Sequence, residues 1–313
     1  MNKRELMFAL LDDNATLPHV PAAFFLHFPP DFHRGQAAVD KHIEFFRHTG
    51  MDFVKIQYEC GFPHLDFIQN PGDWSKMPRY GHDYFADQLA VVEGLVRAMK
   101  PEAVVVLTLY YPFMEARHTA GEETLTRHLN DDPEAVKRGL EIITESMLWF
   151  VRECIKLGID GFYHSTQGGE AARFGDRHIF EQYIKPFDLV LMDEVNKACS
   201  FNILHVCDYL RSYDDFTPFV DYPGHIVNCP LQVGDDVLTP AEAARLFKRP
   251  YMGGMERKGV IATGTPEQIR QTAEAVIAQA PSHFVLAADC TVPNDTSWDN
   301  LKAAIDVAHT GRK

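Results

Sequence analysis

Short apolar runs alternate with longer amphipathic segments along the whole chain, and this alternation limits the possible folds more than any other feature. A strand followed by a helix, repeated eight times, is typical of a (β/α)8 barrel. The runs expected to form strands are residues 20–28, 52–59, 103–111, 161–166, 201–207, 225–229, 250–254 and 283–289. The expected helices are residues 35–49, 83–100, 133–158, 178–198, 239–248, 265–280 and 296–309, with a weaker one at 209–216.

The helix starts support this interpretation. Thr239-Pro240 and Thr265-Pro266 each offer Thr as the N-cap and Pro at the first helical position, and Gln268 completes a capping box with Thr265. A doubly wound sheet is the alternative, but no GxGxxG follows the first expected strand. We therefore predict an α/β fold in which residues 1–313 form a single TIM-barrel domain.

Composition excludes several classes of function. The chain has 313 residues, 46% of them hydrophobic, which is enough for one barrel-sized core. A formal charge of −14 argues against binding to nucleic acid or an anionic membrane. No membrane-spanning run and no signal peptide is recognisable, so a soluble, cytoplasmic protein is expected. The six cysteines suggest free thiols or metal ligands rather than a disulfide framework.

The polar residues that follow the expected strands suggest a metal site. His205 and Cys207 end the fifth strand two residues apart, which points both side chains to one face. Cys290 follows the eighth strand, 85 residues beyond His205, so only a folded scaffold joins it to the pair. One imidazole and two thiolates are typical of a zinc site that keeps a fourth position open for catalysis. In a barrel, all three residues lie at the C-terminal mouth, where active sites are found.

Five further residues are candidates for the same mouth. Cys229, at the end of the sixth strand, is either a fourth zinc ligand or a core thiol. His164 is a candidate for orienting substrate or donating a proton, and Glu59 is a candidate general base. Gly253 and Gly254 are candidates for close backbone approach to a cofactor or ligand, although a tight turn alone explains such a pair.

Several segments resemble the uroporphyrinogen decarboxylase superfamily. The C-terminal half carries the resemblance through GGMERKGVIATGTPEQI and FVLAADCTVPNDTSWDNLKAAIDVAH, with DGFYHSTQGGE and EQYIKPFDLVLMDEV upstream. The resemblance implies that superfamily's barrel. In its true decarboxylases a basic M-R-Q-A-G-R segment follows the first strand, whereas this chain has FLHFPPDFHRG without the arginine pair.

The resemblance is stronger to the superfamily's corrinoid-dependent methyltransferases, which hold zinc on an H-x-C … C pattern. His205, Cys207 and Cys290 match that pattern, and Asp208 departs from it because that branch usually has Gly there. The resemblance implies methyl transfer between a corrinoid (cobalamin) and a thiol or a methylated small-molecule substrate. No D-x-H-x-x-G segment is present, so the corrinoid is expected to arrive free or on a separate protein. The alternatives are a metal-independent decarboxylase acting on a different acid and a non-catalytic protein that binds zinc or corrinoid.

Overall fold

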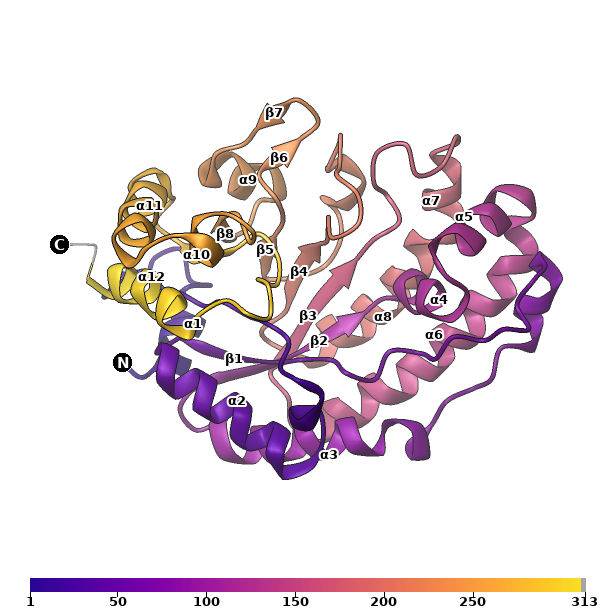
Figure 1. Ribbon diagram of the computed structural model, residues 1–313, viewed down its shortest axis with the longest axis horizontal. Helices are drawn as coiled ribbons and strands as arrows, with labels where there is room; N and C mark the ends of the chain where they lie inside the picture. Colours follow the sequence, from indigo (N-terminus) through magenta and orange to yellow (C-terminus); the bar gives the residue numbers. More distant parts are fainter. Residues whose placement is uncertain (311–313) are drawn as a thin grey trace.

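The computed structural model of the chain, described for residues 1–310, is built around a curled sheet of parallel strands (Figure 1). Seven strands follow one another in the order β1-β2-β3-β4-β5-β8-β9, and every neighbouring pair is parallel. The strands are β1 Phe53–Ile56, β2 Val104–Tyr110, β3 Gly161–Thr166, β4 Ile203–Val206, β5 Ile226–Asn228, β8 Tyr251–Met255 and β9 Phe284–Ala288. The prediction of an α/β barrel fold is confirmed.

The eighth position of the barrel is filled by an irregular segment. Residues 20–28 were expected to form the first strand, but they make only an isolated bridge between Ala22 and Leu286. The amide of Leu286 donates to Pro21 O at 2.9 Å, and the amide of Asp52, just before β1, donates to Ala22 O at 3.0 Å. The segment therefore lies between β9 and β1. Pro21 has no N–H to give to a ladder, which explains why regular pairing fails at that position.

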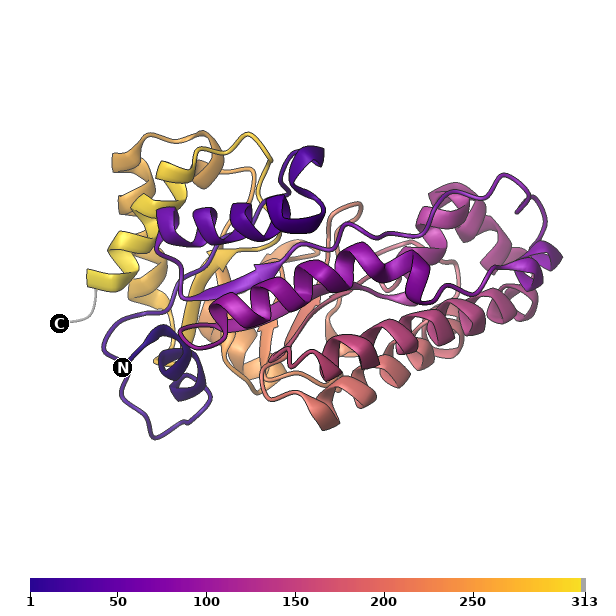
Figure 2. The same cartoon turned by 90° about the horizontal axis from the view of Figure 1, so that it is seen from below.

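Helices cover the outside of the sheet (Figures 1 and 2). Those that follow the strands or connect them are α2 Gly35–Thr49, α3 His82–Met99, α6 Pro133–Lys156, α8 Lys185–Ala198, α9 Pro240–Phe247, α11 Pro266–Gln279 and α12 Trp298–Thr310. Shorter helices are α1 Lys3–Ala9, α4 Pro112–Ala120, α5 Glu122–Asp131, α7 His178–Tyr183 and α10 Val260–Thr263, with 3₁₀ turns at Pro30–Phe32, Pro71–Lys76 and Thr217–Phe219. The strands β6 Gln232–Val233 and β7 Asp236–Val237 form a small separate hairpin.

Two helix predictions were wrong in detail. The segment 178–198 was expected to be one helix, but it breaks at Ile184 into α7 and α8 because Pro186 cannot continue the hydrogen-bond ladder. The weak helix expected at 209–216 is absent, and that stretch is a loop before the 3₁₀ turn Thr217–Phe219. The capping box of Thr265 and Gln268 is confirmed, with Gln268 N 3.3 Å from Thr265 Oγ1.

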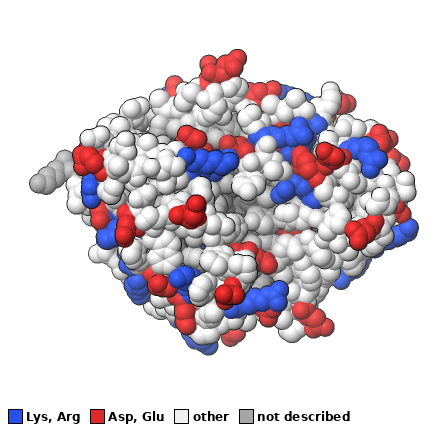
Figure 3. Space-filling model, in the orientation of Figure 1, with Lys and Arg blue, Asp and Glu red and all other residues white. Residues whose placement is uncertain are grey.

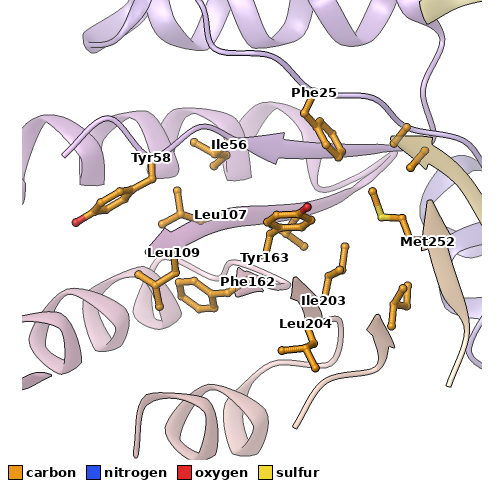
Figure 4. Close-up of a cluster of buried hydrophobic side chains, with 14 of the residues drawn as sticks. Phe25, Ile56, Tyr58, Leu107, Leu109, Phe162, Tyr163, Ile203, Leu204 and Met252 are labelled. Carbon is orange, nitrogen blue, oxygen red and sulfur yellow. The ribbon is translucent and has the colours of Figure 1, made fainter. Parts of the chain in front are cut away.

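The core has two parts, because alternate residues of each strand face opposite ways. Tyr163 and Phe25 lie inside the barrel with their rings 6.4 Å apart (Figure 4). Leu109, Phe162 and Leu204 are fully buried and lie on the side of the strands that faces the helices (Figure 4). This alternation decides which polar residues of a strand can reach the barrel mouth.

On the face of the molecule drawn in Figure 3, acidic and basic side chains are interspersed around a hollowed centre. Within residues 1–310, no helix combines the length and the apolar character that crossing a membrane requires.

Candidate metal centre

The structure brings His205, Cys207 and Cys290 together. His205 lies in β4, Cys207 follows it, and Cys290 lies two residues after β9. One ligand atom from each residue lies within 4.8 Å of the other two, and Cys290 Sγ is 3.4 Å from His205 Nε2. Strands β4 and β9 are separated in the sheet by β5 and β8, so the curl of the sheet creates this cluster.

The spacing of these atoms suits a tetrahedral zinc ion. A nitrogen about 2.1 Å and a sulfur about 2.3 Å from one zinc, at a tetrahedral angle, are roughly 3.6 Å apart. The 3.4 Å between Cys290 and His205 is close to that value. His205 Nδ1 lies 3.3 Å from the carbonyl oxygen of Asn228, which can only accept, so the proton belongs on Nδ1. Nε2 then presents its lone pair toward the cysteines, as a ligand must.

The two thiols are electrostatically unequal. The neighbouring Cys290 thiol and the His205 imidazole lower the pKa of Cys207 well below its ordinary value, although burial opposes the shift. The hydrogen bond with Cys207, together with burial, raises the pKa of Cys290. Cys207 is therefore the thiol of the pair that ionises more readily, and Cys290 is the one that donates the hydrogen bond between them. Gln167 Nε2 donates to Cys207 Sγ at 3.5 Å. A metal ion that replaced the shared proton would complete the deprotonation.

Asn228 fixes the histidine ligand from behind. The Tyr163 ring stacks on the His205 ring at 4.8 Å, and its hydroxyl donates to Asn228 Oδ1 at 2.5 Å. The Asn228 amide in turn donates to the carbonyls of Met252 at 2.8 Å and Ala288 at 3.0 Å. One buried side chain thus ties β3, β5, β8 and β9 together beneath the ligands. The sequence did not identify Asn228, because its role depends on contacts with three other strands.

Asp208, where the resemblance led us to expect Gly, belongs to a buried ion cluster beside the ligands. Arg257 Nη1 donates to Asp208 Oδ1 at 2.8 Å and to Asp289 Oδ2 at 3.0 Å. Asp208 follows Cys207 and Asp289 precedes Cys290, so Arg257 clamps the two ligand-bearing strand ends to each other. Burial raises the pKa of both carboxyls, and the guanidinium partly offsets this.

Cys229 does not join the three ligands. It is fully buried but is not among the residues whose ligand atoms meet within 4.8 Å. Burial, together with the charges of Asp208 and Asp289, raises the pKa of Cys229. The physical reason is alternation: Asn228 points toward Tyr163 inside the barrel, so the next residue points away. Of the two interpretations left open by the sequence, the core thiol fits.

The metal cluster lies in the wall of a cavity of about 580 Å³ at the barrel mouth. Its lining includes basic residues but, across the described chain, no Asp or Glu side chain; the basic ones are His27, Lys55, Arg117, His118, Arg257 and Lys258, besides His205. Lys55 is buried without a carboxylate partner. Its ammonium donates to Gln57 at 3.0 Å and Thr108 at 2.8 Å and lies over the rings of Phe25 and Tyr163. Burial lowers the pKa of Lys55 to about 7.

Glu59 reaches the cavity only through His27. It is not a lining residue, but its Oε1 accepts from Nδ1 of His27 at 2.9 Å, and His27 lines the cavity. Because Nδ1–H donates a hydrogen bond to this carboxylate, the neutral ring carries its lone pair on Nε2. The general base expected at Glu59 stays a prediction, and the structure pairs this carboxylate with His27, which lines the cavity.

His164 faces away from the cavity. Its neighbours Tyr163 and Ser165 line the cavity, whereas its Nδ1 lies 2.6 Å from the buried Tyr111 hydroxyl. Burial lowers the pKa of His164 to about 3. His164 therefore does not line the cavity, because the register of β3 sends it to the helix side of the sheet.

Gly253 and Gly254 are closely packed and do not line the cavity that holds the cysteine cluster. A Cβ on Gly253 would lie 2.3 Å from the Tyr251 hydroxyl, and one on Gly254 would lie 2.4 Å from Val276 Cγ1. Their φ angles of +150° and +99° fall in the region that favours glycine. At both positions a Cβ would therefore meet neighbouring side-chain atoms.

Comparison with known proteins places the chain in a family. No curated protein matches it by sequence. The methyltransferase from Methanosarcina mazei is similar in structure, with a TM-score of 0.77 at 14% identity over 99% of this chain and 98% of that one. B12-independent methionine synthase from Shewanella sp. has a TM-score of 0.54 at 11% identity, over 93% of this chain and 98% of that one. A putative vitamin-B12 independent methionine synthase from Listeria monocytogenes has a TM-score of 0.50 at 13% identity, over 94% of this chain and 97% of that one. At such identities these likenesses show the fold alone. The sequence pattern of the uroporphyrinogen decarboxylase (URO-D) family matches residues 48–311, and the chain therefore belongs to that family.

Proposed function

We propose that this protein is a zinc-dependent methyltransferase that moves a methyl group between a corrinoid and a thiol or methylated small molecule. The observation that carries the proposal is the meeting of His205 Nε2, Cys207 Sγ and Cys290 Sγ in the wall of the cavity. Membership of the URO-D family and structural similarity to a methyltransferase support it.

The three ligand residues fit zinc, and because all three line the cavity, a substrate in the cavity could supply a fourth ligand. Zinc held there would accept the sulfur of a substrate thiol and favour its thiolate form at neutral pH. Gln167, Asn228 and the Arg257 clamp hold the ligand side chains, so that the site is organised before substrate arrives.

Ionising the substrate thiol releases a proton, and His27 is the residue that we assign to accept it. Its Nε2 lone pair is free in the neutral tautomer, and Glu59 stabilises the imidazolium that forms. Transfer to the thiolate then forms a carbon–sulfur bond and breaks the carbon–cobalt bond of the methyl-corrinoid, whose cobalt keeps the electron pair. Methyl transfer from a methylated substrate to the corrinoid is the same step reversed.

Metal analysis and methylcobalamin turnover test the proposal. Purified protein should hold one zinc per chain and should demethylate methylcobalamin, followed by its visible spectrum, with at least one member of a panel of small thiols. Cys207→Ala should abolish both, whereas Cys229→Ser, a change of a buried thiol outside the cluster, should preserve both. Protein that neither contains nor rebinds zinc would refute the proposal.

A second candidate is a metal-independent decarboxylase. The observation that favours it is the cavity lining, which is basic and in which Lys55 has no carboxylate partner. Such a cavity suits an acidic substrate. Release of CO2 from a tested acid by zinc-free protein, with no turnover of methylcobalamin, would establish this function instead.

A further inference from the structure

A second cluster of metal-ligating side chains lies at the end of the barrel opposite the cavity. It joins His19 from the segment before the barrel, Asp52 immediately before β1, and His309 in the last turn of α12. One ligand atom from each lies within 4.8 Å of the others. We propose that these three residues form a second site for a divalent transition-metal ion, independent of the cysteine cluster.

The distances need only small adjustment to hold an ion. His309 Nε2 lies 2.9 Å from Asp52 Oδ2, and His19 Nε2 lies 3.8 Å from the other oxygen of the same carboxylate, Oδ1. Ligands about 2.1 Å from one ion at a tetrahedral angle are roughly 3.4 Å apart, between those two values. The two imidazole rings face each other at 4.5 Å, with both Nε2 atoms toward the same carboxylate. Two imidazoles and one carboxylate suit zinc, cobalt or nickel, with the remaining positions taken by water.

Within the described residues, Nε2 of His19 makes no hydrogen bond. This atom is inaccessible to solvent and lies 3.8 Å from Asp52 Oδ1, too far for a hydrogen bond, although the ring itself is about a quarter exposed. A buried polar atom without a partner is costly, so such atoms in folded proteins call for an explanation such as an ion. A metal ion between His19 and Asp52 would satisfy this nitrogen.

Asp52 is already held firmly, and one cation competes for it. Its side chain is about 1% exposed, and Oδ2 accepts the Ala22 amide at 2.8 Å. Lys3 Nζ lies 3.2 Å from Oδ1 and also donates to the carbonyls of Gly50 and Met51. The ammonium therefore shares the carboxylate with the proposed ion and opposes its charge. We expect weaker binding here than at the cysteine cluster.

The three residues come from parts of the chain that are far apart in sequence. His19 and His309 lie near the two ends, which are also close in space (Figures 1 and 2). An ion would join both terminal segments to β1 at the N-terminal face of the barrel, the face that serves stability rather than catalysis in this fold. Its expected effect is stabilisation, as for any ligand that binds only the folded state.

Cobalt(II) distinguishes the two sites by spectroscopy. The double variant Cys207→Ser/Cys290→Ser has no thiolate at either cluster, so cobalt bound there gives d–d absorption without a thiolate charge-transfer band. We expect this variant to bind one cobalt per chain by equilibrium dialysis and its Tm to rise with added cobalt. In the same background, His19→Gln should remove at least nine-tenths of that affinity while the protein stays folded. The matched control is His48→Gln, which changes a histidine that pairs with Asp299 at the surface.

The variant Lys3→Met should change cobalt affinity in the opposite direction. Removing the competing ammonium should tighten cobalt binding several-fold, even though the protein itself loses contacts to Gly50 and Met51. No cobalt bound by the double cysteine variant, or equal binding after His19→Gln, would overturn the proposal. Unchanged affinity in Lys3→Met would also count against an ion on Asp52. None of these results depends on the proposed methyltransferase activity.

Discussion

At the scale of single residues, the cysteine cluster makes the strongest prediction. Cys290→Ser should lose zinc while keeping its fold, because Cys290 lies in the segment after β9 rather than in the packed interior. Zinc per chain after dialysis and the circular dichroism spectrum measure the two properties separately. Full zinc occupancy in Cys290→Ser would mean that this residue is only a thiol at the barrel mouth.

Asn228→Ala tests whether the ligand cluster depends on its support. The change removes the acceptor of the Tyr163 hydroxyl and two donated bonds to the carbonyls of β8 and β9. The backbone carbonyl that accepts from His205 remains but loses its side-chain support, so zinc affinity is expected to weaken by about 10-fold, the lower end of the effect of losing an outer partner. A competitive chelator titration measures the change, and Asn202→Ala, which disturbs a buried asparagine at the other end of β4, is the control. Equal weakening in both variants would indicate general destabilisation instead.

The His27–Glu59 pair has a kinetic signature. Glu59→Gln and His27→Ala should each lower kcat by about 10²-fold, and the double variant should be no slower than the worse single one, because the two act as a unit. The pH dependence of kcat is the decisive measurement. In Glu59→Gln the protonated form of His27 loses the carboxylate that stabilises it, so the acidic limb of the profile, where the base is protonated, should move to lower pH. If the losses in kcat were additive and the pH profile unchanged, the two residues would not act as a unit.

The sequence predicts those site residues whose positions depend only on local spacing along one strand. His205 and Cys207 were predictable because their two-residue spacing on one strand fixes a common face whatever the partners are. His164 and Cys229 were not, because the face that each presents depends on the register of its strand in the closed barrel. Lys55 was not singled out for a similar reason, since only the closed barrel reveals that it is buried without a carboxylate partner.

At the scale of elements, the alternation of strands and helices predicted the barrel, and the irregular details follow from local chemistry. The helix starts at Thr239 and Thr265 follow directly from capping residues. The irregularity of residues 20–28 was predictable only at Pro21, which cannot donate to a ladder. The remaining residues of the segment have the composition of a strand, and only their position between β9 and β1 shows how few of them pair.

Strand β8 gives a prediction at this scale. Gly254→Ala places a methyl group 2.4 Å from Val276 Cγ1 on α11 and strains a residue with φ +99°. Overpacking and strain together should cost about 2–4 kcal/mol in the free energy of unfolding. The double variant Gly254→Ala/Val276→Ala relieves the clash but not the backbone strain, so it should recover part of the loss, as urea denaturation would reveal. No recovery would mean that backbone strain alone explains the glycine.

At the scale of the whole molecule, acid should destabilise the fold through two buried histidines. His42 Nδ1 donates to Ala38 O at 2.8 Å and its Nε2 accepts the Gln57 amide at 3.1 Å, which fixes the neutral form. Burial lowers the pKa of His42 to about 4 and that of His164 to about 3. In the unfolded chain both titrate near 6.5.

The sign of the effect follows from proton counting. Below pH 6.5 the unfolded state binds protons that the folded state refuses, so the free energy of unfolding falls as the pH falls, until the folded-state pKa values of about 4 and 3 are reached. The loss is about 1.4 kcal/mol per pH unit for each histidine, or up to about 2 kcal/mol each at pH 5. Urea denaturation of the Cys207→Ser/Cys290→Ser variant at pH 7 and pH 5 measures this loss without a contribution from zinc release. Adding His42→Gln, whose amide can still donate to Ala38 and accept from Gln57, should remove about half of the difference. A stability equal at the two pH values would mean that the buried rings accept protons in the folded state.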